Sequence, residues 1–289
     1  MRSEQEMYDL ILSTAQEDER IRAVILNGSR ANPNAPRDIF QDFDVVYVVR
    51  DVEAFTRDHG WIARFGALMV LQMPDLMSDA PPGDIGSFAY LMQFMDGNRM
   101  DLTLFPLEHL AALQADSLSV LLLDKDGIIP PFLPADERGY LPHPPTAKQF
   151  AEACNEFWWV GPYVAKGLWR EEILYARYML DDIMRPQLLQ MLTWHIGVKT
   201  QFQCNPGKMG KYFRRYLEPE VWELLLQTFA AGTYEATWDA LFSMGELFRR
   251  VAVPLAAHFG FDYPFDYDAR VSAHLRHVRT LPRDATEIY

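Results

Sequence analysis

Two aspartates alternate with apolar residues at the start of a run that otherwise has the pattern of a buried β-strand. The run is Gln41-Asp-Phe-Asp-Val-Val-Tyr47. Side chains two positions apart on a strand point to the same face, so Asp42 and Asp44 should stand side by side while Phe43 and Val45 face a core. Two adjacent carboxylates repel each other, and a bound divalent cation relieves that repulsion. The pattern therefore predicts a Mg²⁺ site that is shared with substrate phosphates.

A Gly-Ser pair ends the preceding apolar run, Ile21–Asn27, which we interpret as a buried strand. A glycine lets the backbone approach a ligand closely, and the amides and hydroxyl that follow can donate to a phosphate. Gly28 and Ser29 are therefore candidate phosphate-binding residues, although such pairs are also common in turns. Arg30 and Arg37 flank the polar loop that comes next and could also reach phosphates. Solvated arginines are the alternative interpretation.

Apolar runs on either side of Asp96-Gly-Asn98 predict a β-hairpin. Its strands would be Phe88–Met95 and Arg99–Phe105. Asp101 lies within the second strand, which is unusual because aspartate is depleted from strand interiors. If this strand pairs with the strand at 43–49, Asp101 becomes a third carboxylate of the site. The sequence leaves that pairing open.

The chain changes character near its middle. Strand patterns dominate the first part, six prolines fall between Pro130 and Pro145, and helical periodicity dominates after Thr146. We predict an α/β (α+β) domain with a mixed sheet at residues 1–135 and an all-α helical bundle domain at 136–289. The sequence does not decide whether the segment after Asp266 is ordered.

The composition narrows the choice of partner. The 289 residues carry a formal net charge of −13, which argues against nucleic acid, because binding to its backbone requires lysine and arginine. An acidic surface is compatible with a cationic small molecule, and equally with solubility alone. No signal peptide or membrane-spanning stretch is visible, and Cys154 and Cys204 show no metal-ligand spacing. We expect a cytoplasmic protein without a membrane partner.

A basic window interrupts the acidic chain. No acid occurs from Ile183 to Leu217, whereas lysines and arginines recur there. Such a window could neutralise the charge that develops on a phosphate leaving group. The candidates for phosphate contact are Lys199, Lys208 and Lys211, the last two beside glycines. A solvated basic surface is the alternative.

Three stretches together resemble a known family. They are Leu26-Asn-Gly-Ser-Arg-Ala-Asn-Pro-Asn34, Asp38-Ile-Phe-Gln-Asp-Phe-Asp44 and the later strand with Asp101. The chain resembles the DNA-polymerase-β-type nucleotidyltransferase superfamily and, more closely, the aminoglycoside 6-adenylyltransferases, which modify streptomycin. Gly-Lys-x-Gly-Lys-Tyr at 207–212 supports the closer match, and the likeness covers essentially the whole chain.

The resemblance implies transfer of AMP from ATP to an aminoglycoside hydroxyl, most closely the 6-position of streptomycin, and hence antibiotic resistance. It implies a two-metal in-line mechanism in which Asp42, Asp44 and Asp101 hold two Mg²⁺ ions and Gly28 and Ser29 cradle the triphosphate. Two alternatives stay open: a different acceptor, or a nucleotide-binding relative without turnover. The paired carboxylates argue against the second alternative, because a binding protein does not need them. A monomer is favoured.

A cationic acceptor calls for carboxylates in the helical half, and the candidates are Glu171, Glu172, Asp181 and Asp182. Helical spacing places Asp182 on the face of Arg185. Pro186 cannot donate to the carbonyl of Asp182, so a kink is expected there. We interpret Asp182 as a general base for the acceptor hydroxyl or as an antibiotic ligand, with an ordinary surface acid as the alternative.

Overall fold

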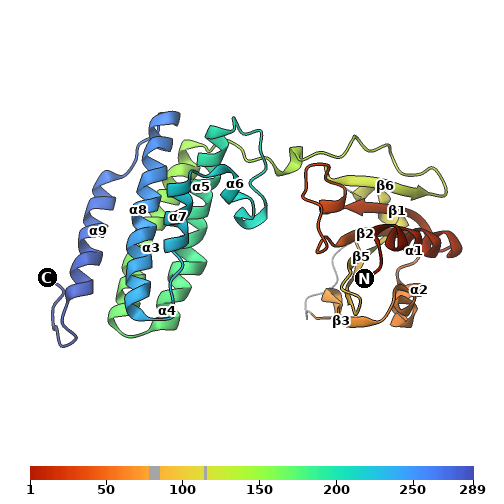
Figure 1. Ribbon diagram of the computed structural model, residues 1–289, viewed down its shortest axis with the longest axis horizontal. Coiled ribbons are helices and arrows are strands. Elements are labelled where there is room, and N and C mark those ends of the chain that lie inside the picture. Colours follow the sequence, from red (N-terminus) through yellow and green to blue (C-terminus); the bar gives the residue numbers. More distant parts are fainter. Residues whose placement is uncertain (78–84, 114–115) are drawn as a thin grey trace. The chain divides into compact units, whose positions relative to one another are not determined.

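The computed structural model describes residues 1–77, 85–113 and 116–289. The chain forms two compact units, Met1–Gly139 and Tyr140–Tyr289 (Figure 1). The division falls within the proline-rich segment. Each unit has its own apolar core, so each is described by itself.

The first unit is built on a six-stranded sheet of order β3-β4-β5-β2-β1-β6. Its strands are β1 Ile21–Asn27, β2 Phe43–Val49, β3 Leu68–Gln72, β4 Phe88–Phe94, β5 Arg99–Pro106 and β6 Ser119–Asp124. β2 and β5 run parallel, whereas the other neighbouring pairs are antiparallel. The predicted mixed sheet and the predicted β4–β5 hairpin are both confirmed.

The alternation along β2 separates core from site. Phe43, Val45 and Tyr47 face helix α1 (Glu4–Glu17), and the Tyr47 hydroxyl donates to the Ile11 carbonyl at 2.7 Å. Val46 and Val48 face the other side of the sheet, where a smaller cluster covers them. Asp44 is on this second face, ahead of Val46, and remains partly exposed. The start of β2 is thus where the sheet offers polar side chains to a ligand.

Short helical segments complete the first unit. They are α2 Glu53–Thr56 and 3₁₀ turns at Gly28–Arg30, His59–Phe65, Pro74–Leu76, Leu107–Ala112 and Arg138–Tyr140. The pattern at 106–115 predicts a helix, and the structure has the 3₁₀ segment there. Residues 114–115 lie outside the described part, as do 78–84 of the loop that the sequence predicts at 73–86.

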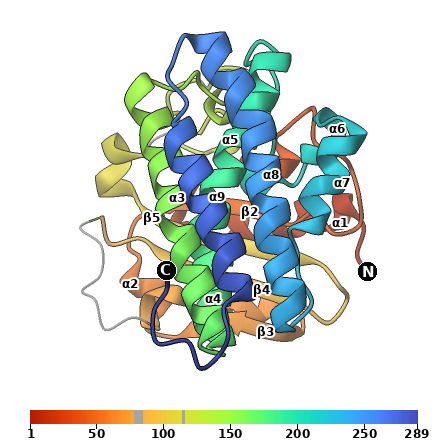
Figure 2. The same ribbon diagram turned by 90° about the vertical axis from the view of Figure 1, so that its left-hand side faces the viewer.

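The second unit is the predicted helical bundle. Its helices are α3 Ala147–Trp169, α4 Ile173–Tyr178, α5 Arg185–Lys199, α6 Phe213–Tyr216, α7 Pro219–Gln227, α8 Tyr234–Phe259 and α9 Phe265–Thr280. A π-helical stretch, Met179–Met184, joins α4 to α5, so the break that Pro186 predicts is present. Figure 2 shows α9 beside α3, which it contacts along its length. The segment after Asp266 is therefore a packed helix as far as Thr280, and residues 281–289 follow it without helical structure.

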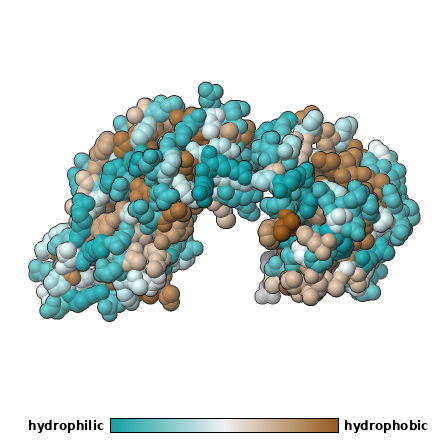
Figure 3. Space-filling model, in the orientation of Figure 1, coloured by the Kyte–Doolittle hydropathy of each residue, from teal (hydrophilic) through white to brown (hydrophobic). Residues whose placement is uncertain are grey.

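The surface is mixed in character. Among the described residues, no helix is long and apolar enough to cross a membrane. Hydrophilic residues are spread over the visible face of both units, between smaller apolar patches (Figure 3).

Candidate active site

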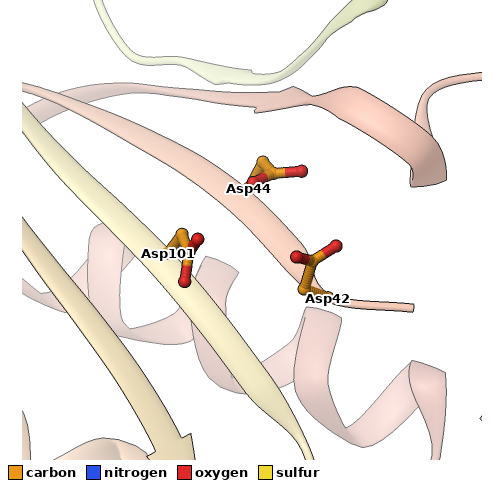
Figure 4. A group of neighbouring side chains, drawn as sticks. All are labelled: Asp42, Asp44 and Asp101. Atoms are coloured by element: carbon orange, nitrogen blue, oxygen red, sulfur yellow. The ribbon is translucent and has the colours of Figure 1, made fainter. Parts of the chain in front are cut away.

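Strand pairing brings the three aspartates together. Asp44 and Asp101 are direct partners in the parallel β2–β5 register, and Asp42 lies immediately before β2. One carboxylate oxygen from each residue lies within 4.8 Å of the others. Figure 4 shows the three side chains on the neighbouring strands. The strand adjacency on which the third carboxylate depended is thus present in the structure.

The cluster is electrostatically unfavourable by itself. Burial raises the pKa of Asp44 to about 6, and the negative charges of Asp42 and Asp101 add to that shift. A divalent cation supplies the compensation that this arrangement lacks, and hard carboxylate oxygens suit Mg²⁺. The three residues therefore fit a Mg²⁺ site in both donor chemistry and spacing.

Arg99 is a site residue that the sequence interpretation missed. Its Nε donates to Asp101 Oδ1 at 2.9 Å and its Nη2 donates to Oδ2 at 2.7 Å. Its Nε also lies 4.0 Å from Asp42 Oδ2. The available signal was its position two residues before Asp101 on one strand, which places both side chains on one face. Arg99 orients Asp101 and offsets part of the negative charge of the cluster.

Gly28 touches Asp44 so closely that only glycine fits. Its φ is +73°, and a Cβ there would lie 2.1 Å from Asp44 Oδ2. Its amide donates to the Leu118 carbonyl, which fixes the turn at the end of β1. Ser29 follows in the same turn and is partly exposed. The Gly-Ser turn thus lies directly against the carboxylate cluster.

Arg30 and Arg37 lie in different environments. Arg30 is buried, donates to the main-chain carbonyls of Gln41 at 2.7 Å and Asp42 at 2.9 Å, and stacks on the Phe43 ring at 3.7 Å. Its guanidinium therefore holds the entry to β2, and this geometry does not favour the predicted phosphate contact. Arg37 is exposed, 3.3 Å from a Glu4 carboxylate oxygen. An exposed ion pair such as Arg37–Glu4 is weak, so the Arg37 side chain can change its conformation.

The basic window lies in the second unit, and its three candidate lysines also lie in different environments. The Lys199 ammonium donates to the Tyr216 carbonyl at 2.8 Å and pairs with Glu218 at 2.7 Å, so it serves the fold. Lys208 and Lys211 are exposed, and no ion pair within the described ranges holds either. They belong to a turn in which Gly207 and Gly210 have φ of +78° and +77°. Of the three predicted lysines, these two are free to bind a phosphate.

That Asp182 shares a face with Arg185 stays a prediction, because among the described residues Asp182 forms no ion pair with Arg185. Asp181 forms that pair instead: Arg185 Nη2 donates to Asp181 Oδ1 at 2.7 Å, and Arg177 pairs with the other carboxylate oxygen at 2.7 Å. Asp181 precedes Arg185 by four residues, so their ion pair is one that ordinary helical spacing allows. Asp182 is exposed, without an ion pair in the described part of the chain.

These features define the class of protein. A mixed sheet with a Gly-Ser turn against an Asp-x-Asp strand, and a third aspartate on the parallel neighbour, is the arrangement expected of the nucleotidyltransferases that the sequence resembles. A family model described as streptomycin adenylyltransferase matches residues 1–278. The chain belongs to this family of aminoglycoside nucleotidyltransferases.

Individual relatives agree over nearly the full length. The chain is 42% identical over 277 residues to an aminoglycoside 6-adenylyltransferase of Bacillus subtilis (strain 168), covering 95% of this chain and 97% of that protein. Identity to the Campylobacter jejuni enzyme of the same name is also 42%, covering 95% of each chain. The crystal structure of an aminoglycoside 6-adenyltransferase from Bacillus subtilis is 38% identical, covers 97% of this chain and 100% of that one, and gives a TM-score of 0.47.

Proposed function

We propose that this protein transfers AMP from ATP to the 6-hydroxyl of streptomycin and thereby confers resistance to it. The observation that carries the proposal is the carboxylate cluster of Asp42, Asp44 and Asp101, with one oxygen of each within 4.8 Å. Its position against the Gly28 turn adds a backbone surface for phosphate. Family membership supports an aminoglycoside as the acceptor.

The residues of the first unit take distinct roles in this reaction. Two bound Mg²⁺ ions would stabilise the attacking and the leaving oxygen of an in-line displacement. Asp42 and Asp44 would hold the nucleotide metal, and Asp101 would complete the ligand set on the acceptor side. Gly28 lets the turn approach the triphosphate closely, and Ser29 offers amide and hydroxyl donors to it. Arg99 keeps Asp101 oriented.

The helical unit would complete the nucleotide and acceptor sites. Lys208 and Lys211 would offset the charge that develops on pyrophosphate. Asp182 would accept the proton of the acceptor hydroxyl, because an exposed carboxylate without an ion pair in the described chain can act as a general base. Because the reaction consumes ATP, we propose that it takes place in the cytoplasm.

The test is an Asp42→Asn variant, incubated with Mg-ATP and streptomycin. We expect the wild-type protein to add the mass of one AMP to streptomycin, and the variant to lose about a thousandfold or more in rate with its thermal transition unchanged. Asp9→Asn is the control, because Asp9 is an exposed acid on α1. Transfer that survives in Asp42→Asn would overturn the carboxylate assignment. Transfer only to other aminoglycosides would overturn the acceptor.

A further inference from the structure

The helical unit contains a cavity that is lined by none of the site residues discussed above. It has a volume of about 940 Å³ and opens between the first half of α3 and the facing part of α5. Its lining residues all belong to the Tyr140–Tyr289 unit, so its shape depends on that unit alone. A cavity of this size lies near the upper end of the range for small-molecule sites.

The lining is acidic and rich in hydrogen-bonding groups. Glu152 and Glu156 are four residues apart on α3, so their side chains share one face of that helix. The lining contains no lysine or arginine. The other polar groups of the lining are His143, Gln149, Asn155, Gln187, Gln190 and Thr193.

Glu156 is the most informative of these residues. It is half-buried, and among the described residues it has no hydrogen bond or ion pair. Glu152 has only a loose contact, 3.7 Å, with the exposed Lys148. Removing a carboxylate from water without a partner is unfavourable, and a cationic ligand reverses that balance. The carboxylates of the cavity wall therefore favour a ligand that carries positive charge.

An indole completes the wall. Trp194 lines the cavity from α5 and is 6% exposed. Its N–H has no hydrogen-bond partner in the part of the chain that the structure describes, and it is not sealed from solvent. An indole N–H beside amides and carboxylates offers a hydrogen-bond donor to a hydroxyl of a sugar or cyclitol ring.

We propose that this cavity binds the acceptor of the reaction, a cationic, hydroxyl-rich aminocyclitol antibiotic. Glu152 and Glu156 pair with its guanidinium or ammonium groups, and Gln187 and Gln190 bind its hydroxyls. A triphosphate does not suit the cavity, because two carboxylates would face it with no lining cation. This inference rests on the proposed function and locates its substrate.

The experiment compares Glu156→Gln and the double variant Glu152→Gln/Glu156→Gln with the wild type. We expect KM for streptomycin to rise about tenfold in the single variant and further in the double variant, because each lost partner is a charge-assisted hydrogen bond. The kcat and the KM for ATP should stay unchanged. Calorimetry on the full chain with streptomycin, without ATP or metal, should show the same loss of affinity.

Glu223→Gln on α7 is the matched control, since it removes an equal charge at an exposed position outside the cavity. If the double variant does not fold, Ala151→Arg replaces it, because Ala151 is an exposed residue of the lining. Unchanged KM and affinity for streptomycin, in an enzyme that still modifies it, would overturn the cavity assignment. Absence of transfer by the wild type would instead overturn the proposed function.

Discussion

At the scale of single residues, the surroundings of Asp44 disfavour the ionised form of its carboxyl group. Asp44 is partly buried, stands beside Asp101 in the sheet, and fills the space that a Cβ on the left-handed Gly28 would need. Its raised pKa means that the folded protein holds a proton there more tightly than the unfolded chain. Two predictions follow from these contacts.

The first concerns pH. The pKa of Asp44 rises from 3.8 to about 6 on folding, so its contribution to stability is complete below pH 3.8 and is lost as pH rises through about 6. Without metal, Asp44→Asn should therefore be more stable than the wild type at about pH 8, and the gap should close at about pH 4. Denaturant unfolding in EDTA measures this, with Asp9→Asn as control. Equal stability at the higher pH would contradict the prediction.

The second concerns Gly28. Gly28→Ala places a methyl group 2.1 Å from Asp44 Oδ2, so the carboxylate must move. We expect a loss of about a hundredfold in transfer rate, the scale of an ångström-sized misplacement. Gly127→Ala is the matched control, because Gly127 has φ of +64° and nothing within 4 Å of its added Cβ. Both variants should lose about 1 kcal/mol to backbone strain, and equal activities would show that the contact with Asp44 does not matter.

At the scale of elements, two helices show where periodicity is insufficient. Helical spacing allows Arg185 to pair with Asp181 or Asp182, and it pairs with Asp181 while also donating to the distant Thr228. Helix α9 is polar for most of its length, and it is held by contacts with α3 and by Arg249, whose Nε donates to the buried Asp268 at 2.6 Å. Both features depend on neighbours that a local pattern does not contain.

The turn at 207–211 gives the third prediction. Lys211→Gln and Lys208→Gln should each raise KM for ATP severalfold with an unchanged thermal transition, because both lysines are exposed. Lys199→Gln should leave KM for ATP unchanged and cost less than about 1 kcal/mol of stability, since its pair with Glu218 is partly solvated. Steady-state kinetics and thermal unfolding separate the two effects. An unchanged KM in both turn variants would place the turn outside the nucleotide site.

At the scale of the whole molecule, the chain consists of two units with separate cores. The helical core contains contributions from α3, α5, α7, α8 and α9 and needs no residue of the sheet. We predict that residues 140–289 expressed alone give a helical circular dichroism spectrum and one cooperative thermal transition. A gradual, non-cooperative melt would show that the helical unit depends on the sheet.

The sequence by itself determined the features that arise from neighbours along the chain. The Asp42–Asp44 pair, the Gly-Ser turn, the hairpin at Asp96-Gly-Asn98 and the helical second half all follow from local periodicity and turn chemistry. Only the tertiary structure decided that Asp101 completes the cluster, that Arg99 holds it, and that Arg30 is buried against Gln41 and Asp42. The reason is that these contacts join segments distant in the chain, and packing selects one pairing among many that the pattern permits.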